Sequence, residues 1–184
     1  DDSKAAEIQL KVVRSIKVWT ENYTSISADI DDLEVLYEFH KEGEASEDDV
    51  QNHYDICIEK IEGLEFKNML SAEEDSLSAV VQITAGAGGT EACDWAEMIL
   101  RMYKMWAEKN NFKIKLLDHQ SGDVAGIKTV TIEIEGDFAF GYLKGENGVH
   151  RLVRVSPYNS QGKRMTSFAS VYVYPLADDS IEIT

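Results

Sequence analysis

The chain has few basic residues. Its 184 residues include 18 lysines and arginines against 34 aspartates and glutamates, which gives a net charge of −16 at pH 7. The deficit is concentrated in residues 1–75, with 21 acidic and 7 basic side chains, whereas residues 76–184 hold 13 and 11. Such a chain does not bind a polyanion non-specifically as a whole. Any contact with nucleic acid must therefore come from a local patch that reads shape and bases, and we expect no binding to DNA.

Cysteine is scarce as well, with only Cys57 and Cys93. Neither has a second cysteine or another metal ligand at metal-binding spacing, so we expect two buried thiols in a reducing, cytoplasmic compartment. Long apolar runs are also lacking. None approaches the ~20 residues of a membrane span, and the start lacks the basic and apolar regions of a secretory signal. The sequence therefore predicts no membrane partner.

The two ends of the sequence look cut. The chain begins Asp1-Asp2-Ser3 without methionine and stops at Thr184 in a stretch that reads as a strand, so we expect a fragment of a longer protein. This length suffices for one good hydrophobic core or two small ones. An apolar share of 43% together with three tryptophans predicts a folded chain.

Metal-binding and catalytic constellations are missing too. The four histidines are scattered without an HxxxH pair, so we predict no metal site and no cofactor. One of them, His150, is expected to be a hydrogen-bonded structural residue. There is no Ser/His/Asp or Cys/His arrangement. Glu91 and Asp94 lie one helical turn apart, as is typical of acids that interact with a helix dipole. The sequence therefore predicts no catalytic residue.

Residues 1–75 read as three helices. Apolar residues at spacings of three and four form one stripe over residues 8–23 and another over 26–40, and Gly43 ends the second. Ser46, followed by Asp49, predicts the start of a third helix with a stripe from Val50 to Leu64. Short links favour an antiparallel hairpin or bundle. We interpret the acid excess as its solvated face, and a docking surface for a basic protein partner is the alternative.

Residues 76–184 mix strands with a helix. We predict strands at Ala79–Thr84, Phe112–Leu117, Val130–Glu135 (half-buried), Val149–Val155 and Phe168–Tyr174, the last ended by Pro175, and a helix over Glu91–Asn110 with Trp95, Met98, Met102 and Trp106 inside. Asp137–Lys144 is short and aromatic. Helices followed by a mixed α/β part predict an α+β protein with two domains, a helical one at 1–75 and an α/β one at 76–184.

The segment AGAGGTEA, Ala85–Ala92, is a glycine-rich link between a predicted strand and a predicted helix. It lacks the third glycine of a dinucleotide fingerprint, since Glu91 stands there, and it lacks the Gly-Lys-Ser/Thr of a P-loop. Three interpretations remain open. The loop binds an anion at the helix start, it is a tight turn that needs positive φ, or its backbone approaches another ligand with Glu91 beside it.

The run GVHRLVRVSPYNSQGKRMTSF, Gly148–Phe168, is a basic island on this acidic chain. It contains four basic side chains, Arg151, Arg154, Lys163 and Arg164, with Lys144 just upstream. A Ser156-Pro157-Tyr158 turn opens a polar loop, expected to be exposed, that ends in Arg164-Met165-Thr166. Hydroxyl groups, a stacking aromatic ring and cations together are the groups that read unstacked RNA bases. A plain Ser-Pro turn on a basic surface is the other interpretation.

The motifs GGTEAxDW and GVHRLVRxSP, found here within Gly88–Trp95 and Gly148–Pro157, are long and specific. From Ala85 to about Ile183 the chain resembles the bacterial peptide chain release factor 2 family, which belongs to the class I release factors, and the helical part fits the family's first domain more loosely. The resemblance implies translation termination. The partners it implies are the ribosome at its small-subunit decoding site, the stop codon of the mRNA and ribosomal RNA.

The resemblance also implies roles for single residues. Ser156, Pro157 and Tyr158 match the tripeptide that reads the codon, with the serine accepting a purine at the second position, so that UGA and UAA both fit. Other matches are Gly88 and Glu91 at the helix start that reads the first uracil, Thr166 near the third base, and Arg164 with Lys163 steadying the loop and its RNA surroundings.

Three departures from the family pattern stand out. Tyr158 replaces a phenylalanine and so adds a hydroxyl. Met165 replaces a histidine that stacks among the codon bases; a thioether packs on a base but lacks the planar ring. The Gly-Gly-Gln tripeptide that serves peptidyl-tRNA hydrolysis is absent, because in the family it lies downstream of this segment. We therefore expect this chain to carry recognition residues and no catalytic group.

Two other functions compete with this one. A release-factor-like protein without peptide-release activity, acting in RNA binding or ribosome rescue, would share these motifs. A Gly-Gly-Gln within the next ~80 residues of the gene would decide against it. A glycine-loop nucleotide enzyme is the second alternative, but the chain has neither a phosphate motif nor a catalytic constellation.

Overall fold

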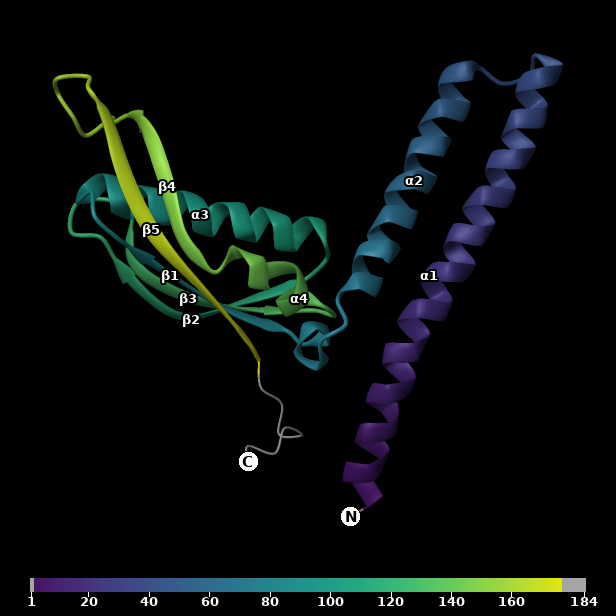
Figure 1. Ribbon diagram of the computed structural model, residues 1–184, viewed down its shortest axis with the longest axis horizontal. Helices are drawn as coiled ribbons and strands as arrows, with labels where there is room; N and C mark the ends of the chain where they lie inside the picture. Colours follow the sequence, from purple (N-terminus) through teal and green to yellow (C-terminus); the bar gives the residue numbers. More distant parts are fainter. Residues whose placement is uncertain (1, 177–184) are drawn as a thin grey trace. The chain divides into compact units, whose positions relative to one another are not determined.

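The computed structural model describes residues 2–176; the strand expected at the last residues of the chain lies outside this range. Contacts divide the chain into two compact units, Asp1–Met69 and Leu70–Thr184, a few residues before residue 75. In the described part, the first unit has two helices and the second has a five-stranded sheet with helices (Figure 1). No helix within residues 2–176 is long and apolar enough to cross a membrane.

The first unit starts with one long helix, α1 (Asp2–Glu42), where the sequence analysis predicted two. That prediction was wrong, because nothing between the two apolar stripes interrupts the helical hydrogen bonds. Tyr23 and Ile26 are three residues apart, which continues the helical spacing, and neither glycine nor proline stands between them. The helix ends at Gly43, which has a φ of +81° and whose amide donates to the carbonyl of His40.

The second helix of this unit, α2 (Glu47–Met69), begins at the predicted capping pair. The Asp49 amide donates to Ser46 Oγ at 3.1 Å, and the Ser46 amide and hydroxyl donate to Asp49 Oδ2 at 3.2 and 2.6 Å. These bonds from Ser46 favour the carboxylate and lower the pKa of Asp49. The predicted start of this helix is confirmed. The two helices run antiparallel as a hairpin (Figure 1).

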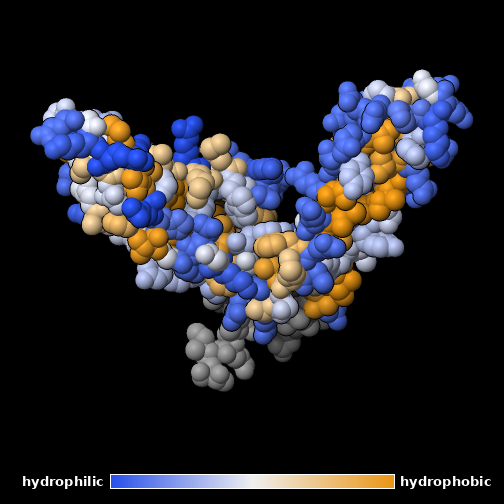
Figure 2. Space-filling model, turned by 45° about the horizontal axis from the view of Figure 1, so that its top comes forward, coloured by the Kyte–Doolittle hydropathy of each residue, from blue (hydrophilic) through white to orange (hydrophobic). Residues whose placement is uncertain are grey.

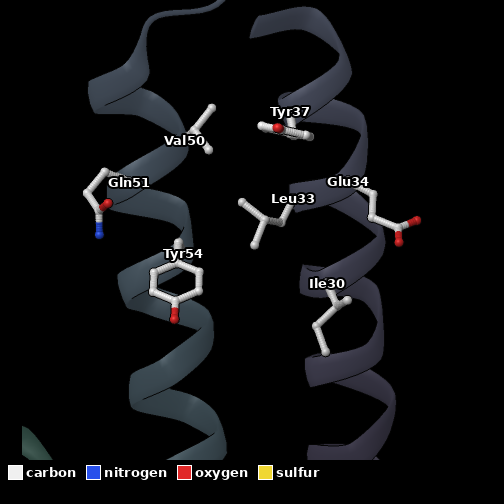
Figure 3. A pocket seen from close by; sticks show the side chains of 7 residues that line it. All are labelled: Ile30, Leu33, Glu34, Tyr37, Val50, Gln51 and Tyr54. Carbon is white, nitrogen blue, oxygen red and sulfur yellow. The ribbon is translucent and has the colours of Figure 1, made fainter. Parts of the chain in front are cut away.

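An apolar groove of about 420 Å³ lies between these two helices (Figure 3). Ile30, Leu33 and Tyr37 of α1 line it on one side, and Val50 and Tyr54 of α2 line it on the other. Figure 2 shows apolar surface along the hairpin with hydrophilic margins. Most acidic side chains of the hairpin are exposed, as expected of a solvated face. Docking of a basic protein partner stays a prediction.

The two cysteines differ in burial. Cys57 is only 3% exposed, and its thiol lies 3.6 Å from the carbonyl oxygen of Asp29. Cys93, in the second unit, is half-buried. The expectation of two buried thiols therefore holds for Cys57 and is wrong for Cys93, which lies one turn inside the start of a helix whose first turn is partly open.

The second unit is built on an antiparallel sheet with the strand order β2-β3-β1-β5-β4. Its strands are β1 (Ala79–Ala85), β2 (Lys113–Ser121), β3 (Ile127–Glu135), β4 (Gly148–Val155) and β5 (Arg164–Pro175). Its helical segments are the 3-10 turns η1 (Glu73–Ser76) and η2 (Lys144–Glu146) and the helices α3 (Thr90–Lys109) and α4 (Ala139–Leu143). The predicted α+β class is confirmed.

Helix α3 packs against the sheet and forms the main core with it (Figure 1). Its buried side chains Ala96, Ile99, Leu100, Tyr103 and Ala107 form one cluster with alternate residues of β1 (Ala79, Val81, Ile83) and β3 (Val130, Ile132, Ile134). The period-two alternation in β3 is the predicted one. Met98 and Met102, expected inside, are 41% and 46% exposed, because the small and aliphatic side chains occupy the face of α3 that meets the sheet.

Strand β5 begins at Arg164, four residues earlier than predicted. Arg164, Met165 and Thr166 pair with Val155, Arg154 and Val153 of β4, so they belong to a strand and not to the preceding loop. The sequence pattern missed this part because these side chains project beyond the core, and no alternation of apolar and polar residues marks them.

Candidate functional site

The glycine loop makes the turn from β1 into α3. Gly88 and Gly89 have φ values of +137° and +61°, the positive φ that a tight turn of glycines provides. A Cβ on Gly88 would lie 2.6 Å from Ser167 Oγ, whereas a Cβ on Gly89 would meet nothing within 4 Å. The loop is fixed to β5 by hydrogen bonds to both backbone groups of Phe168. Gly88 is therefore required by its φ and by its close approach to β5.

Two carboxylates at the start of α3 hold one guanidinium. Arg154 Nε donates to Glu91 Oε1 at 2.5 Å, and Arg154 Nη2 donates to Asp94 Oδ2. Glu91 is only 5% exposed. The hydrogen bond from Arg154 lowers the pKa of Glu91 against the opposing effect of burial, and the bond to Glu91 raises the pKa of Arg154. A buried, ionised carboxylate at this helix start repels a phosphate, which argues against the anion interpretation of the loop.

Ser156 is bound to the same carboxylate. Its hydroxyl donates to Glu91 Oε2 at 2.5 Å and accepts the amide of Tyr158 at 3.1 Å. The side chain is 4% exposed. The expectation of an exposed loop was therefore wrong at Ser156. The reason is that β4 carries the serine directly over the start of α3, where Glu91 binds it.

Tyr158 extends from the loop to the other acid of the pair. Its hydroxyl donates to Asp94 Oδ1 at 3.2 Å, and 45% of the residue remains exposed. Desolvation and then the charge of Asp94 raise the pKa of Tyr158 above its ordinary value. The residue also lines the pocket described next.

These side chains line a pocket of about 350 Å³. Its lining comprises five residues expected from the sequence, Gly88, Glu91, Ser156, Tyr158 and Met165, together with Thr90, Asn159, Ser160 and Gln161. Hydroxyl, amide and carboxylate groups line it with one thioether and one aromatic ring, a set suited to the edges and faces of bases. Of the other expected residues, Pro157 lies in the loop, and Arg164 and Thr166 lie on β5 outside the pocket lining.

The basic island has fewer available cations than the sequence indicated. Lys144 Nζ contacts both carboxylate oxygens of Asp75, at 2.6 and 2.8 Å, and Asp75 is 1% exposed. Arg154 is held by its two acids. Arg151, Lys163 and Arg164 form no ion pair with any described residue, and they remain available to an RNA backbone.

His150 lies on β4 and is hydrogen-bonded, as expected. Its Nε2 is 3.0 Å from the carbonyl oxygen of Glu146, and its own carbonyl accepts Trp95 Nε1 at 3.0 Å. Glu146 Oε2 accepts the hydroxyl of Tyr103 at 2.9 Å. The bonds of Trp95 and Tyr103 fix α3 to β4 and to the turn η2 before it. Among the described residues, no group of acids, histidines and cysteines is placed to hold a metal ion.

The comparison with known families identifies this architecture. A family model described as PCRF domain matches residues 1–171. The chain belongs to the PCRF domain family. It is 44% identical over 185 residues to peptide chain release factor 2 of Bordetella avium (strain 197N) and 47% identical over 185 residues to that of Acidovorax sp. (strain JS42). All of this chain is matched in both cases, and it spans 50% of each relative.

A solved structure, RF2 of Thermus thermophilus, has a fold similar to this PCRF domain. The TM-score is 0.65 with 38% sequence identity, and the match covers 90% of this chain and 46% of that one. The resemblance to the release factor 2 family is confirmed. The chain spans about half the length of the curated relatives that it matches, so the activity of the whole protein is a matter of proposal.

Two important residues of this PCRF domain were missed as site residues from the sequence. Arg154 was assigned to the basic island, and Asp94 to the helix dipole. A signal for both was present. Arg154, on β4, and Ser156, the first residue after it, are two apart, a spacing that puts side chains on one face where the chain stays extended. Glu91 and Asp94 are one turn apart on a helix. Two pairs of this kind on adjoining elements favour one cluster.

Proposed function

We propose that the second unit of this chain reads the stop codons UGA and UAA in translation termination. The observation that carries the proposal is the position of Ser156, held over the start of α3 by Glu91 at the edge of a polar pocket. The longer protein would act in the cytoplasm, at the decoding site of the small ribosomal subunit, with mRNA and ribosomal RNA as its partners.

The hydrogen bonds of Ser156 define what it offers to a base. Its single proton points to the ionised Glu91, and one lone pair accepts the amide of Tyr158. The remaining capacity of Oγ is that of an acceptor. Adenine and guanine both carry N–H donors on their Watson–Crick edges, so one acceptor serves either purine. This supports reading of UGA and UAA, which differ at the second position.

Other lining groups support contact with unpaired bases. Tyr158 and Met165, 45% and 40% exposed, offer a ring and a thioether. Asn159, Ser160 and Gln161 add neutral donors and acceptors. Gly88 and Glu91 place the start of α3 beside them, where the first uracil would be read. We assign Thr166 to the region of the third base, and Arg164 with Lys163 to the RNA backbone.

The test is codon-dependent binding. The purified 184-residue chain, carrying a fluorescent label, is titrated with ribosomes that present UGA, UAA, UAG or UGG in the decoding site. We expect tighter binding to UGA and UAA than to the other two codons. Ser156→Ala should weaken that binding by about 1–3 kcal/mol, or roughly ten- to hundredfold, since a base donor loses its acceptor in a closed site.

Ser170→Ala is the matched control. Ser170 is a half-buried serine of β5, outside the pocket, with one weak hydrogen bond of 3.4 Å to the carbonyl of Thr84, and its loss should leave codon binding unchanged. Equal binding to all four codons would contradict the proposal and favour a general RNA-binding role. Met165→His should restore a planar stacking group and strengthen binding to UGA and UAA.

We further propose that catalysis of peptide release belongs to the other half of the longer protein. The 184-residue chain alone should release no peptide from ribosomes that carry peptidyl-tRNA and a stop codon. Stop-dependent release by the purified chain would show that it holds the group that positions the attacking water.

A further inference from the structure

Tyr158 closes a ring of hydrogen bonds around the start of α3. Its backbone amide donates to Ser156, Ser156 donates to Glu91, and Arg154 joins Glu91 to Asp94. The Tyr158 hydroxyl donates to Asp94 and completes the ring. The bonds among Ser156, Glu91, Arg154 and Asp94 join α3 to the end of β4, whereas both bonds of Tyr158 come from the loop.

We propose that the Tyr158 hydroxyl is a latch that holds the 157–162 loop closed against the start of α3 in the free protein. Ser156 is 4% exposed and lines the pocket together with the loop residues Asn159, Ser160 and Gln161, so opening of the loop gives a base more room to reach its Oγ. The bond from the Tyr158 hydroxyl to Asp94 is made by the end of a loop side chain. It is therefore the bond that breaks first when the loop moves away from α3. A phenylalanine, which the family pattern has here, leaves the ring open.

Two features of Asp94 suit it to this role. It is held in place by Arg154, so Tyr158 meets a fixed acceptor and not a free side chain. It is also charged, which strengthens the hydrogen bond it accepts. The latch is nevertheless weak enough to open, because the tyrosine is 45% exposed and the O–O distance is 3.2 Å.

Hydrogen exchange of the loop amides in the isolated 184-residue chain tests the latch without a ribosome. The amides of Tyr158, Gln161 and Gly162 donate within the loop, at 3.1, 2.9 and 3.1 Å, and report its opening. Tyr158→Phe keeps the ring and removes the hydroxyl. We expect exchange in the loop to rise by about two- to tenfold, which corresponds to the loss of one hydrogen bond to a partly exposed acceptor.

Tyr174→Phe is a closely matched control. Tyr174 is also 45% exposed, and its hydroxyl also makes one 3.2 Å bond, to Gln82 Oε1 on the sheet. Its removal should leave exchange in the loop unchanged. In an Asp94→Ala background the acceptor is already gone, so adding Tyr158→Phe should have no further effect.

The latch is refuted if Tyr158→Phe exchanges like Tyr174→Phe, or if its effect persists in the Asp94→Ala background. Its consequence for decoding rests on the proposed function: Tyr158→Phe should bind UGA ribosomes two- to tenfold faster, since less of the free protein is closed. If Tyr158→Phe raises exchange in the loop as expected but ribosome binding does not depend on the codon, the proposed function alone is refuted. If ribosome binding is codon-selective but Tyr158→Phe leaves exchange in the loop unchanged, the latch alone is refuted.

Discussion

Removing the Arg154 guanidinium should destabilise the second unit strongly. Glu91 is 5% exposed. In Arg154→Met it keeps the Ser156 hydroxyl as a partner but loses the cation with which it pairs. Breaking a buried ion pair on one side costs about 3–5 kcal/mol. We expect about 3 kcal/mol, the lower end, because the Arg154 side chain is 28% exposed and water can reach part of the site.

The paired variant identifies the cause. In Arg154→Met combined with Glu91→Gln, no buried charge is left alone, and the amide oxygen of the new glutamine can still accept the Ser156 hydroxyl. The double variant should therefore be more stable than Arg154→Met by about 1–2 kcal/mol, even though it carries one more substitution. Urea denaturation at pH 7, followed by the fluorescence of Trp95 and Trp106, measures the difference.

The pH dependence has a definite sign. The pKa of Glu91 is lowered in the folded state, mainly by Arg154, so its contribution to stability is present above its unfolded value near 4.5 and is lost as the pH falls through the lower folded value. The stability gap between the wild-type chain and Arg154→Met should be full at pH 7 and should shrink below pH 4.5. Equal stabilities for the single and double variants, or a gap independent of pH, would refute the reasoning.

Three other outcomes follow from the same structure. Ser156→Ala should cost about 1–2 kcal/mol of unfolding free energy, because it removes two hydrogen bonds. Ser167→Ala should be neutral or stabilising, since Ser167 Oγ is buried without a hydrogen-bond partner among the described residues. Urea denaturation compares the two variants. Gly88→Ala should destabilise by more than about 2 kcal/mol, through its φ and the contact with Ser167, and Gly89→Ala by about 1 kcal/mol, through φ alone; thermal melting ranks the two. Deletion of residues 1–69 should leave a second unit that still melts cooperatively, because it has its own core; a melt without a transition would show a shared core.

Much of the fold could be predicted from local patterns. The capping pair Ser46–Asp49, the alternation over Val130–Glu135 and the glycine turn each carry their signal within a few residues. The errors arise where local patterns are silent. The break predicted inside α1 had no glycine or proline to support it, and the polar start of β5 is a strand because β4 pairs with it.

The sequence identified several residues of the candidate site, but it did not show how their side chains contact one another. The motifs located Gly88, Glu91, Ser156 and Tyr158, and the structure brings all four to one pocket. Their bonds depend on a contact between positions more than 60 residues apart in the sequence. A serine in a polar loop reads as exposed for this reason, and only the register of β4 over the start of α3 buries it.

If the chain reads codons as proposed, the charge of the site accounts for how an acidic protein meets RNA. Arg154, the basic residue nearest to Ser156, is neutralised by Glu91 and Asp94 and contributes order, not attraction. Of the other basic residues of the Gly148–Phe168 run, Arg151 lies on β4, Lys163 in the loop and Arg164 on β5, and none forms an ion pair with a described residue. Attraction to phosphates is therefore limited, and affinity must come largely from hydrogen bonds and stacking, which depend on the identity of the base. On the proposed function, this division favours the rejection of wrong codons, because every cation would add affinity for right and wrong codons alike.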